Sequence, residues 1–201
     1  MEYPGNKREF FNDIAQDWQR EHAMEEQREE LVAFSSHFEM KFGDKVLDIG
    51  CGTGRLLPII LDQVGETGLV VAADYSENML VLSRAAKSAG NLLYLQCDAH
   101  NTPICSELFD KVICFALFPH LAPKEQALGE FFRILKPEGD LLIAHQMSRR
   151  QLNAFHKKVK GPVTKDLLPP KYKMRSLLTG AGFMDFTILD QPSLYLVHAR
   201  K

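Results

Sequence analysis

The sequence has little that would link it to a membrane or to an oxidising compartment. It contains no apolar run of the roughly 20 residues that a helix needs to cross a bilayer. The stretch from Met1 to Arg8 mixes both charges without an apolar core, so no signal peptide is expected. The four cysteines form no C-x-x-C pair, which favours buried free thiols over disulfides or a zinc site. We therefore expect a cytoplasmic protein with no membrane partner.

The sequence also lacks an excess of positive charge. Its 24 basic and 26 acidic side chains give a formal net charge of -2. The two basic stretches, Arg149-Arg150 and residues 157–160, have a pattern typical of a solvated helix face. A protein that binds nucleic acid commonly needs a basic surface. We therefore expect no nucleic-acid partner.

Apolar runs of strand length alternate with amphipathic stretches of helix length, and no repeat interrupts them. This pattern predicts a single α/β domain with a doubly wound, Rossmann-like sheet that is mostly parallel. The predicted parallel strands are residues 45–49, 69–73, 92–96, 111–115 and 141–144. The predicted helices between them are residues 54–64, 76–89 and 123–135.

The alternation ends after residue 145. Two helices are predicted there, at residues 148–160 and ending near Gly180, followed by strands 186–189 and 193–199 that form an antiparallel edge. Two amphipathic helices, residues 7–18 and 24–37, precede the first strand and are expected to form a lid over the C-terminal edge of the sheet. Their apolar stripe is equally compatible with ordinary packing against the core.

The run V-L-D-I-G-C-G-T-G at residues 46–54 predicts a buried strand and a glycine-rich turn that opens a helix. Glycines at alternate positions allow positive φ angles and let a ligand lie against bare main chain. Asp48, two residues before the first glycine, would repel a phosphate and suits a ligand with a cationic part. Arg55 stands where the dinucleotide pattern G-x-G-x-x-G needs a small residue, which disfavours a nucleotide-dependent oxidoreductase.

The spacing D-x-G-x-G-x-G resembles motif I of the class I S-adenosylmethionine-dependent methyltransferases. The segment F-D-K-V-I-C at 109–114 is similar to the family's F-D-x-V strand, and L-K-P-E-G at 135–139 to its L-K-P-G-G turn. The segment F-F-N-D-I-A-Q-D-W at 10–18 resembles the N-terminal helix of the UbiE-like and type 11 members, which methylate small molecules. The resemblance implies one methyltransferase domain, with residues 1–40 as lid, 41–145 as the core that binds S-adenosylmethionine, and 146–201 on the substrate side.

The resemblance also implies roles for acidic residues at the strand ends. Asp48 and the glycine loop would hold the methionyl part, Asp74 the ribose hydroxyls, and Asp98 with Ala99 the adenine. Each acid alone is also compatible with a plain helix-end or turn role. The implied cofactor residues are Asp48, Gly50, Cys51, Gly52, Gly54, Asp74, Tyr75, Met79, Asp98, Ala99 and Phe115. Cys51 could act as a nucleophile, but no base stands beside it in the sequence.

Three histidines are predicted to meet at the acceptor side of the site. His120 follows the fourth strand, His145 ends the fifth, and His156 lies three residues after Asn153 on one helix face. The functional hypothesis makes His145 or His120 a general base and Asn153 and His156 substrate ligands. A metal site of three imidazoles with Asp166 is an alternative that no H-x-x-x-H spacing supports, and purely structural hydrogen bonds are another. We therefore predict no metal.

The sequence as a whole predicts methyl transfer from S-adenosylmethionine to a small-molecule acceptor, by a monomer or homodimer. No N/D-P-P-Y run follows the fourth predicted strand, which disfavours methylation of nucleic-acid bases. Two alternatives stay open: a nucleotide-dependent oxidoreductase, opposed by Arg55, and a protein that binds S-adenosylmethionine without turnover.

Overall fold

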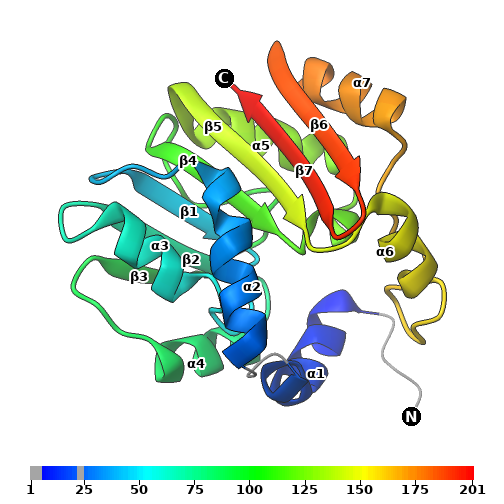
Figure 1. Ribbon diagram of the computed structural model, residues 1–201, viewed down its shortest axis with the longest axis horizontal. Helices are drawn as coiled ribbons and strands as arrows, with labels where there is room; N and C mark the ends of the chain where they lie inside the picture. The colour runs from blue at the N-terminus through cyan, green and yellow to red at the C-terminus, as the bar shows by residue number, and fades with distance from the viewer. Residues whose placement is uncertain (1–5, 22–24) are drawn as a thin grey trace.

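The computed structural model describes residues 6–21 and 25–201, and a seven-stranded sheet runs through its centre (Figure 1). The strand order is β3-β2-β1-β4-β5-β7-β6. The first five strands pair in parallel, whereas β7 is antiparallel to both β5 and β6. The strands are β1 (Lys45–Ile49), β2 (Leu69–Asp74), β3 (Leu92–Gln96), β4 (Phe109–Phe115), β5 (Leu135–His145), β6 (Asp185–Gln191) and β7 (Leu194–Arg200). The predicted, mostly parallel Rossmann-like sheet with antiparallel C-terminal strands is confirmed.

Helices cover both faces of the sheet, as expected for strands that are nearly continuous apolar runs. One buried cluster joins a sheet face to α3 and α4, including Leu57 and Leu80. The other joins the opposite face to α5 and α7, including Phe131 and Leu178. The helical segments are α1 (Lys7–Glu21), α2 (Glu25–Ser35), η1 (Ser36–Phe38), α3 (Leu57–Val64), α4 (Glu77–Ala86), η2 (Phe118–His120), α5 (Lys124–Ile134), α6 (Arg149–His156) and α7 (Lys171–Ala181).

The strand order reverses between β1 and β4, which lie side by side at the centre of the sheet. In an open α/β sheet, the crevice beyond the carboxyl ends of the strands at such a point is where ligands bind. The glycine run follows β1, and the segment that contains His120 follows β4. The fold therefore brings the two most informative parts of the sequence to one edge of the sheet.

Several element boundaries differ from the sequence prediction. The helix after the glycine run begins at Leu57 instead of residue 54, because Gly52 and Gly54 take positive φ angles of 55° and 85° that no α-helix accommodates. The helix predicted for 76–89 ends at Ala86, and the one predicted for 148–160 ends at His156. Because α3 begins only at Leu57, the glycine turn extends further along the chain than predicted.

The L-K-P-E-G segment, predicted as a turn before the fifth strand, belongs to β5 itself. Phe109 pairs with Leu135, whereas Lys111 pairs with Asp140, so β5 carries extra residues in an irregular bulge. Glu138 within it has a φ angle of 64°. The predicted chain reversal is thus absorbed as a bulge of a longer strand.

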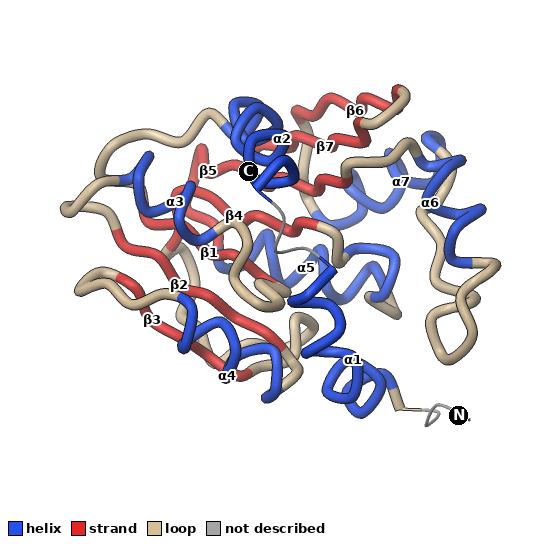
Figure 2. Tube along the Cα trace, turned by 60° about the horizontal axis from the view of Figure 1, so that its bottom comes forward, coloured by secondary structure: helices blue, strands red, loops and turns tan. Residues whose placement is uncertain are grey.

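The two N-terminal helices pack at different places around the sheet. Helix α1 packs against α4 and lies beyond the C-terminal edge of the sheet (Figure 2). Helix α2 lies across a sheet face, and Leu31, Phe34 and Phe38 at its end belong to the buried cluster that contains Leu57. The expectation of a lid made by both helices is therefore wrong for α2, and its expected first residue, Met24, lies outside the described residues. Within the described ranges, none of the helices has the length and apolarity that a membrane span requires.

Candidate functional site

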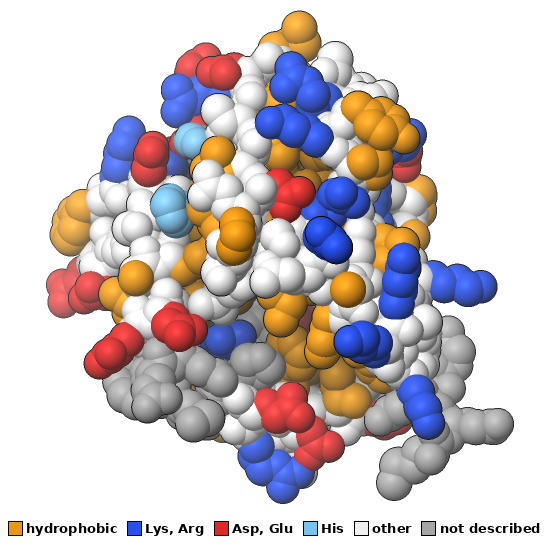
Figure 3. Space-filling model, turned by 45° about the vertical axis from the view of Figure 1, so that its right-hand side comes forward, with side chains coloured by type: hydrophobic (Ala, Val, Ile, Leu, Met, Phe, Trp, Pro, Cys, Tyr) orange, Lys and Arg blue, Asp and Glu red, His pale blue; other side chains and the backbone are white. Residues whose placement is uncertain are grey.

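A cavity of about 990 Å³ opens at the C-terminal edge of the sheet. It extends from the glycine loop after β1, past α1, to the segment that joins β5 to α6. Figure 3 shows hydrophobic side chains gathered in a hollow on this side of the molecule, with Lys and Arg side chains around it. The lining includes the predicted cofactor residues Asp48, Gly50, Cys51, Gly52, Asp74, Tyr75, Met79, Asp98, Ala99 and Phe115.

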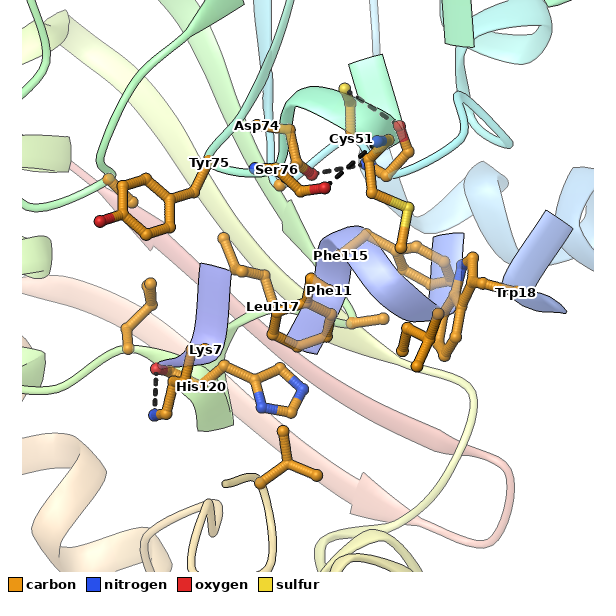
Figure 4. Close-up of a pocket in the computed structure, with 18 of the residues that line it drawn as sticks. Lys7, Phe11, Trp18, Cys51, Asp74, Tyr75, Ser76, Phe115, Leu117 and His120 are labelled. Atoms are coloured by element: carbon orange, nitrogen blue, oxygen red, sulfur yellow. Dashed lines mark hydrogen bonds between the residues drawn. The ribbon is translucent and has the colours of Figure 1, made fainter. Parts of the chain in front are cut away.

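The glycine loop is tied to the end of β2. The backbone N–H groups of Gly50 and Cys51 donate to the carbonyl of Ala73 at 2.7 and 3.0 Å, and the N–H of Gly52 donates to Asp74 Oδ2 at 2.8 Å (Figure 4). Gly50 and Gly52 have φ angles of 75° and 55°, a region that glycine enters without strain. The loop therefore lies open to the cavity while its amide groups are fixed in place.

Asp48 is the carboxylate nearest the start of this loop. Its residue is only 2% exposed, and its Oδ2 atom is buried with no hydrogen-bond partner among the described residues. Burial, together with the nearby charge of Asp74, raises the pKa of Asp48 to about 7. A buried carboxylate with an unused oxygen beside a ligand cavity favours a cationic ligand group, because a cation would satisfy both the charge and the lone pairs. The carboxylate of Asp48 thus fits the positively charged amino group and sulfonium of S-adenosylmethionine and disfavours a negatively charged pyrophosphate.

Asp74 organises the other side of the loop. Besides Gly52, its carboxylate accepts the N–H of Ser76 at 2.8 Å. Burial raises its pKa, and the backbone hydrogen bonds from Ser76, Gly52 and Tyr75 partly oppose that shift. Ser76 in turn caps α4 by accepting from Met79 N, and its hydroxyl donates to Asn12 of α1 at 2.6 Å. Asp74 therefore holds the loop, and Ser76 links the start of α4 to the lid helix.

Asp98 and Ala99 lie where the third strand leads into the cavity. Asp98 Oδ1 accepts the backbone N–H of His100 at 2.9 Å and lies 2.6 Å from its Nδ1 atom. Ala99 is buried at the cavity wall. A carboxylate has capacity for a further donor at its second oxygen, so the pair keeps the hydrogen-bonding groups that an adenine would need.

Gly54 is the one predicted cofactor residue that does not line the cavity. A Cβ atom at this position would collide with the Ser83 side chain of α4. Its φ angle of 85° also favours glycine. The structure thus gives Gly54 a packing role between the loop and α4, and cofactor contact at Gly54 stays a prediction.

Cys51 is placed at the cavity but is not suited to nucleophilic chemistry. Its pKa is raised well above the ordinary thiol value, chiefly by burial and then by the charges of Asp48 and Asp74. Its Sγ atom lies 3.6 Å from the carbonyl oxygen of Gly52. Because the thiolate is the nucleophilic form, a thiol held protonated here is inert.

Helix α1 forms one wall of the cavity with Phe11, Ile14 and Trp18. Figure 4 shows the Phe11 and Trp18 side chains projecting from α1 towards the space between the glycine loop and His120. A Cβ atom added to Gly52 would lie 3.9 Å from the indole nitrogen of Trp18, so the ring stands directly over the loop. The helix therefore screens the loop from solvent, as the lid hypothesis requires of it.

The three predicted histidines all line the far end of the same cavity. The ring centroids of His120 and His156 lie 5.0 Å apart, and the Phe11 ring lies 5.2 Å from His120 with its edge towards the face. Apolar lining residues come from the segment around η2 and from α6 with the segment after it: Leu117, Leu121, Leu152, Phe155, Val159 and Val163. This end of the cavity can hold a small, partly apolar molecule against imidazole nitrogens.

His145 is the most deeply buried of the three and is a poor proton acceptor. Burial, followed by the nearby His120 and His156, lowers its pKa to about 3. Its Nε2 atom is buried and has no hydrogen-bond partner among the described residues. A ring with so low a pKa is a weak base, which argues against the predicted role of His145 as general base.

Asn153 does not face the cavity, contrary to the prediction that it binds substrate. Its amide donates to the carbonyl of Leu168 at 3.0 Å and accepts the N–H of Leu168 at 2.9 Å. Both ends of the amide are thereby used to fix the segment that follows α6. His156, three residues later, lines the cavity, and its Nδ1 atom contacts the backbone carbonyl of Asp166.

From the sequence, Asp166 is expected only in the alternative metal site, and Lys7 only as the first residue of the N-terminal helix. In the structure, Asp166 Oδ2 lies 2.8 Å from Nδ1 of His120, and Asp166 Oδ1 accepts from Lys7 Nζ at 2.8 Å. A long polar side chain at the start of an amphipathic helix gives no sequence signal for such a contact. Across residues 6–21 and 25–201, no group of three or more His, Cys, Asp or Glu side chains is arranged to hold a metal ion.

Comparison with known proteins gives a consistent relationship. Residues 47–143 match the family model described as a methyltransferase domain. The ubiquinone/menaquinone biosynthesis C-methyltransferase UbiE of Edwardsiella ictaluri is 38% identical over 120 residues, which cover 57% of this chain and 47% of that protein. The UbiE protein of Saccharophagus degradans is 41% identical over 109 residues, covering 52% and 43%. The chain thus spans less than half the length of these two relatives.

Solved structures share the fold over almost the whole chain. A methyltransferase of Haloferax volcanii, solved in complex with the Trm112 methyltransferase activator, has a TM-score of 0.77 at 20% identity and covers 94% of this chain and 96% of its own. A SAM-dependent methyltransferase from Aquifex aeolicus has a TM-score of 0.68 at 22% identity, covering 99% of both chains. The matched domain and the relatives support a class I S-adenosylmethionine-dependent methyltransferase, and the solved structures share its Rossmann-like fold.

Proposed function

We propose that this protein transfers a methyl group from S-adenosylmethionine to a small-molecule acceptor, with both bound in one cavity. The observation that carries the proposal is the continuity of that cavity. Its lining includes Asp48 and the glycine loop at one end and His120 and His156 at the other. Methyl transfer needs nucleophile, methyl carbon and leaving sulfur in line, so a single enclosed space for both partners is what the reaction requires.

At the glycine-loop end, the family's methyl donor supplies an electrophilic methyl carbon on a sulfonium. We assign Asp48 to the donor's amino-acid part, Asp74 to the ribose hydroxyls, and Asp98 with Ala99 to the adenine. Trp18 and Phe11 of the lid exclude water from this end, which protects the sulfonium and strengthens the electrostatic contacts. The unpartnered Asp48 oxygen supports the first assignment most strongly.

At the histidine end, the shape and chemistry support a compact acceptor with an apolar body. Leu117, Leu121 and Val163 contribute apolar wall, while ring nitrogens of His120 and His156 offer hydrogen bonds. The formal net charge of -2 supports a small molecule over a nucleic acid. The UbiE relatives act, by name, in ubiquinone and menaquinone biosynthesis, but they match this chain over only part of their length. The acceptor is therefore proposed by class alone.

We further propose that residues 1–201 act as one methyltransferase domain, as a monomer or homodimer in the cytoplasm. All four cysteines are free, which supports a reducing compartment. A binding protein without turnover is the second candidate, and it is favoured only if the histidines prove irrelevant to methyl transfer. A nucleotide-dependent oxidoreductase is opposed by the charge of Asp48, which lines the cavity where a pyrophosphate would lie. It is also opposed by Arg55, which stands where the dinucleotide pattern needs a small residue.

The test is incubation of the purified protein with methyl-labelled S-adenosylmethionine and a cell extract divided into small-molecule and macromolecule fractions. We expect label to enter the small-molecule fraction, and Asp74→Asn protein to transfer far less of it. Label entering only protein or nucleic acid would contradict the small-molecule class. Binding of the donor without transfer to either fraction would favour the binding protein.

A further inference from the structure

Three distant segments meet at His120. Lys7 is the first residue of α1, His120 ends the short helix η2 after β4, and Asp166 lies between α6 and α7. Lys7 Nζ donates to Asp166 Oδ1 at 2.8 Å and to the backbone carbonyl of His120 at 2.8 Å. Asp166 Oδ2 lies 2.8 Å from Nδ1 of His120. The lid helix is thereby fastened to the backbone of His120 and to the carboxylate that orients the His120 imidazole.

These contacts decide which nitrogen of His120 faces the acceptor. An ionised carboxylate only accepts hydrogen bonds, so Nδ1 carries the proton that it donates to Asp166. The Nε2 atom then holds a lone pair, and no hydrogen bond of the described residues engages it. The ring lines the cavity against Phe11. His120 is thus oriented as a proton acceptor towards the acceptor end, in the way that a carboxylate orients the imidazole of other acid–base catalysts.

Asp166 orients a second imidazole through its main chain. Its carbonyl oxygen contacts Nδ1 of His156, and a carbonyl can only accept, so the Nδ1 atom of His156 carries the hydrogen of this contact. The Asp166 side chain is only 10% exposed, and Lys7 is its cationic partner. One residue of the segment after α6 therefore fixes two rings of the acceptor end.

We propose that Asp166 and Lys7 are positioning residues that set His120 as the base for the methyl-accepting group, and that this base is complete only when α1 is seated. This rests on the methyl transfer proposed above. A base is needed only where the reacting atom loses a proton, so the acceptor reacts at an O–H, N–H, S–H or acidic C–H group. In the reaction the proton of that group passes to His120 Nε2 and its electron pair forms the bond to the methyl carbon. The methyl–sulfur bonding pair stays on sulfur, giving methylated acceptor and S-adenosylhomocysteine.

The charged groups around His120 shift its pKa in opposite directions, which can be measured. Burial lowers the pKa of His120 most, Asp166 raises it, and His156 and Lys7 lower it. His145 lies in the same cavity and stays neutral. Burial lowers the pKa of Lys124, and Lys124 lies close enough to Asp166 for that carboxylate to oppose the shift. Removing the Asp166 charge should therefore lower the pKa of His120, and removing the Lys7 charge should raise it.

The test is nitrogen NMR of the ring atoms in histidine-labelled, full-length protein, with the His120 signals assigned by their loss in His120→Gln. Without any donor or acceptor present, we expect His120 to be protonated on Nδ1 and bare on Nε2 at neutral pH. Titration should give a lower His120 pKa in Asp166→Asn and a higher one in Lys7→Met. Lys158→Met, which removes an exposed lysine with no side-chain contact among the described residues, is the matched control and should leave the pKa unchanged.

A proton on Nε2 of His120 in the unaltered protein would overturn the proposal, and this measurement needs no variant to fold. Shifts of the same sign in Asp166→Asn and Lys7→Met, or shifts no larger than in Lys158→Met, would also overturn it. In turnover, His120→Gln should lose about 100-fold or more in kcat with donor affinity kept, and Lys7→Arg should retain most activity. Absence of all methyl transfer would refute the proposed function alone, because the NMR result does not depend on it.

Discussion

The carboxylate of Asp74 accepts the backbone N–H of Gly52 at 2.8 Å, so the acid that ends β2 fixes the glycine loop that follows β1. The same carboxylate also receives the N–H of Ser76. An acid at this place thus has a structural task in addition to the ribose contact that we propose for it. The structural task and the ribose contact can be separated by comparing Asp74→Ala with Asp74→Asn.

Replacing Asp74 should weaken donor binding and destabilise the fold together. Asp74→Ala removes the partner of two backbone N–H groups and any ribose contact, each hydrogen bond to a charged group contributing about 1.5–3 kcal/mol. Asp74→Asn keeps one accepting oxygen and should lose less stability but still bind the donor more weakly. Calorimetry and thermal unfolding measure the two effects, with the exposed Asp62→Asn as control. Unchanged donor affinity in Asp74→Asn would remove the ribose contact from the account.

Trp18 should report binding at the glycine loop. It is the chain's one tryptophan, and it lines the cavity above Gly52. A ligand that enters there changes the surroundings of the indole, so titration with S-adenosylhomocysteine should change the protein's tryptophan emission. Trp18→Phe should bind with similar affinity by calorimetry but give no optical signal. Constant emission during calorimetrically detected binding would place the ligand elsewhere.

Asp48 should make the protein less stable as pH rises from about 4 to about 7. Its pKa is about 7 in the fold, against an ordinary value of 3.8, so within this window the native state holds a proton that the unfolded chain has released. The free energy of unfolding therefore falls as pH rises. Asp48→Asn should remove this dependence and be the more stable protein at pH 7, by on the order of a few kcal/mol. Identical pH dependence of the two proteins in urea unfolding would contradict the buried state of Asp48.

His145 should make the protein less stable as pH falls from about 6.5 to about 3. Its pKa is about 3 in the fold, against 6.5 ordinarily, so the unfolded chain binds a proton that the native state excludes between these values. Stability is complete above pH 6.5 and is lost as pH falls towards 3. His145→Gln should unfold less readily in acid than the unaltered protein relative to their stabilities at pH 7. An equal acid sensitivity of both proteins would mean that the ring is accessible to protons.

The parts of the fold that the sequence predicts well are those with a local cause. Apolar runs identify β1, β2 and β3 within a residue. The strands β1 and β2 are largely buried, and a strand covered on both faces needs apolar side chains throughout. Ser76 predicts the start of α4, since a serine side chain can accept from the N–H three residues on, and it accepts from Met79. Such features depend on neighbours in the chain and so can be found without the structure.

The parts that the sequence missed depend on long-range packing. The spacing of Asn153 and His156 correctly puts them on one helix, but only the structure shows that Asn153 fixes Leu168 while His156 reaches the cavity. Glycine spacing likewise does not separate Gly52, which faces the cavity, from Gly54, which faces Ser83. Contacts between Lys7 and Asp166 cross 159 positions of sequence and carry no local signal.

The central claim is that the glycine-loop end of the cavity takes S-adenosylmethionine. The most direct test is calorimetric titration of the purified protein with S-adenosylmethionine, S-adenosylhomocysteine, NAD and NADP under one set of conditions. The account predicts saturable, one-site binding of the first two, weakened in Asp74→Asn, and no heat from the dinucleotides. Binding of NAD or NADP in place of the adenosyl compounds would contradict it.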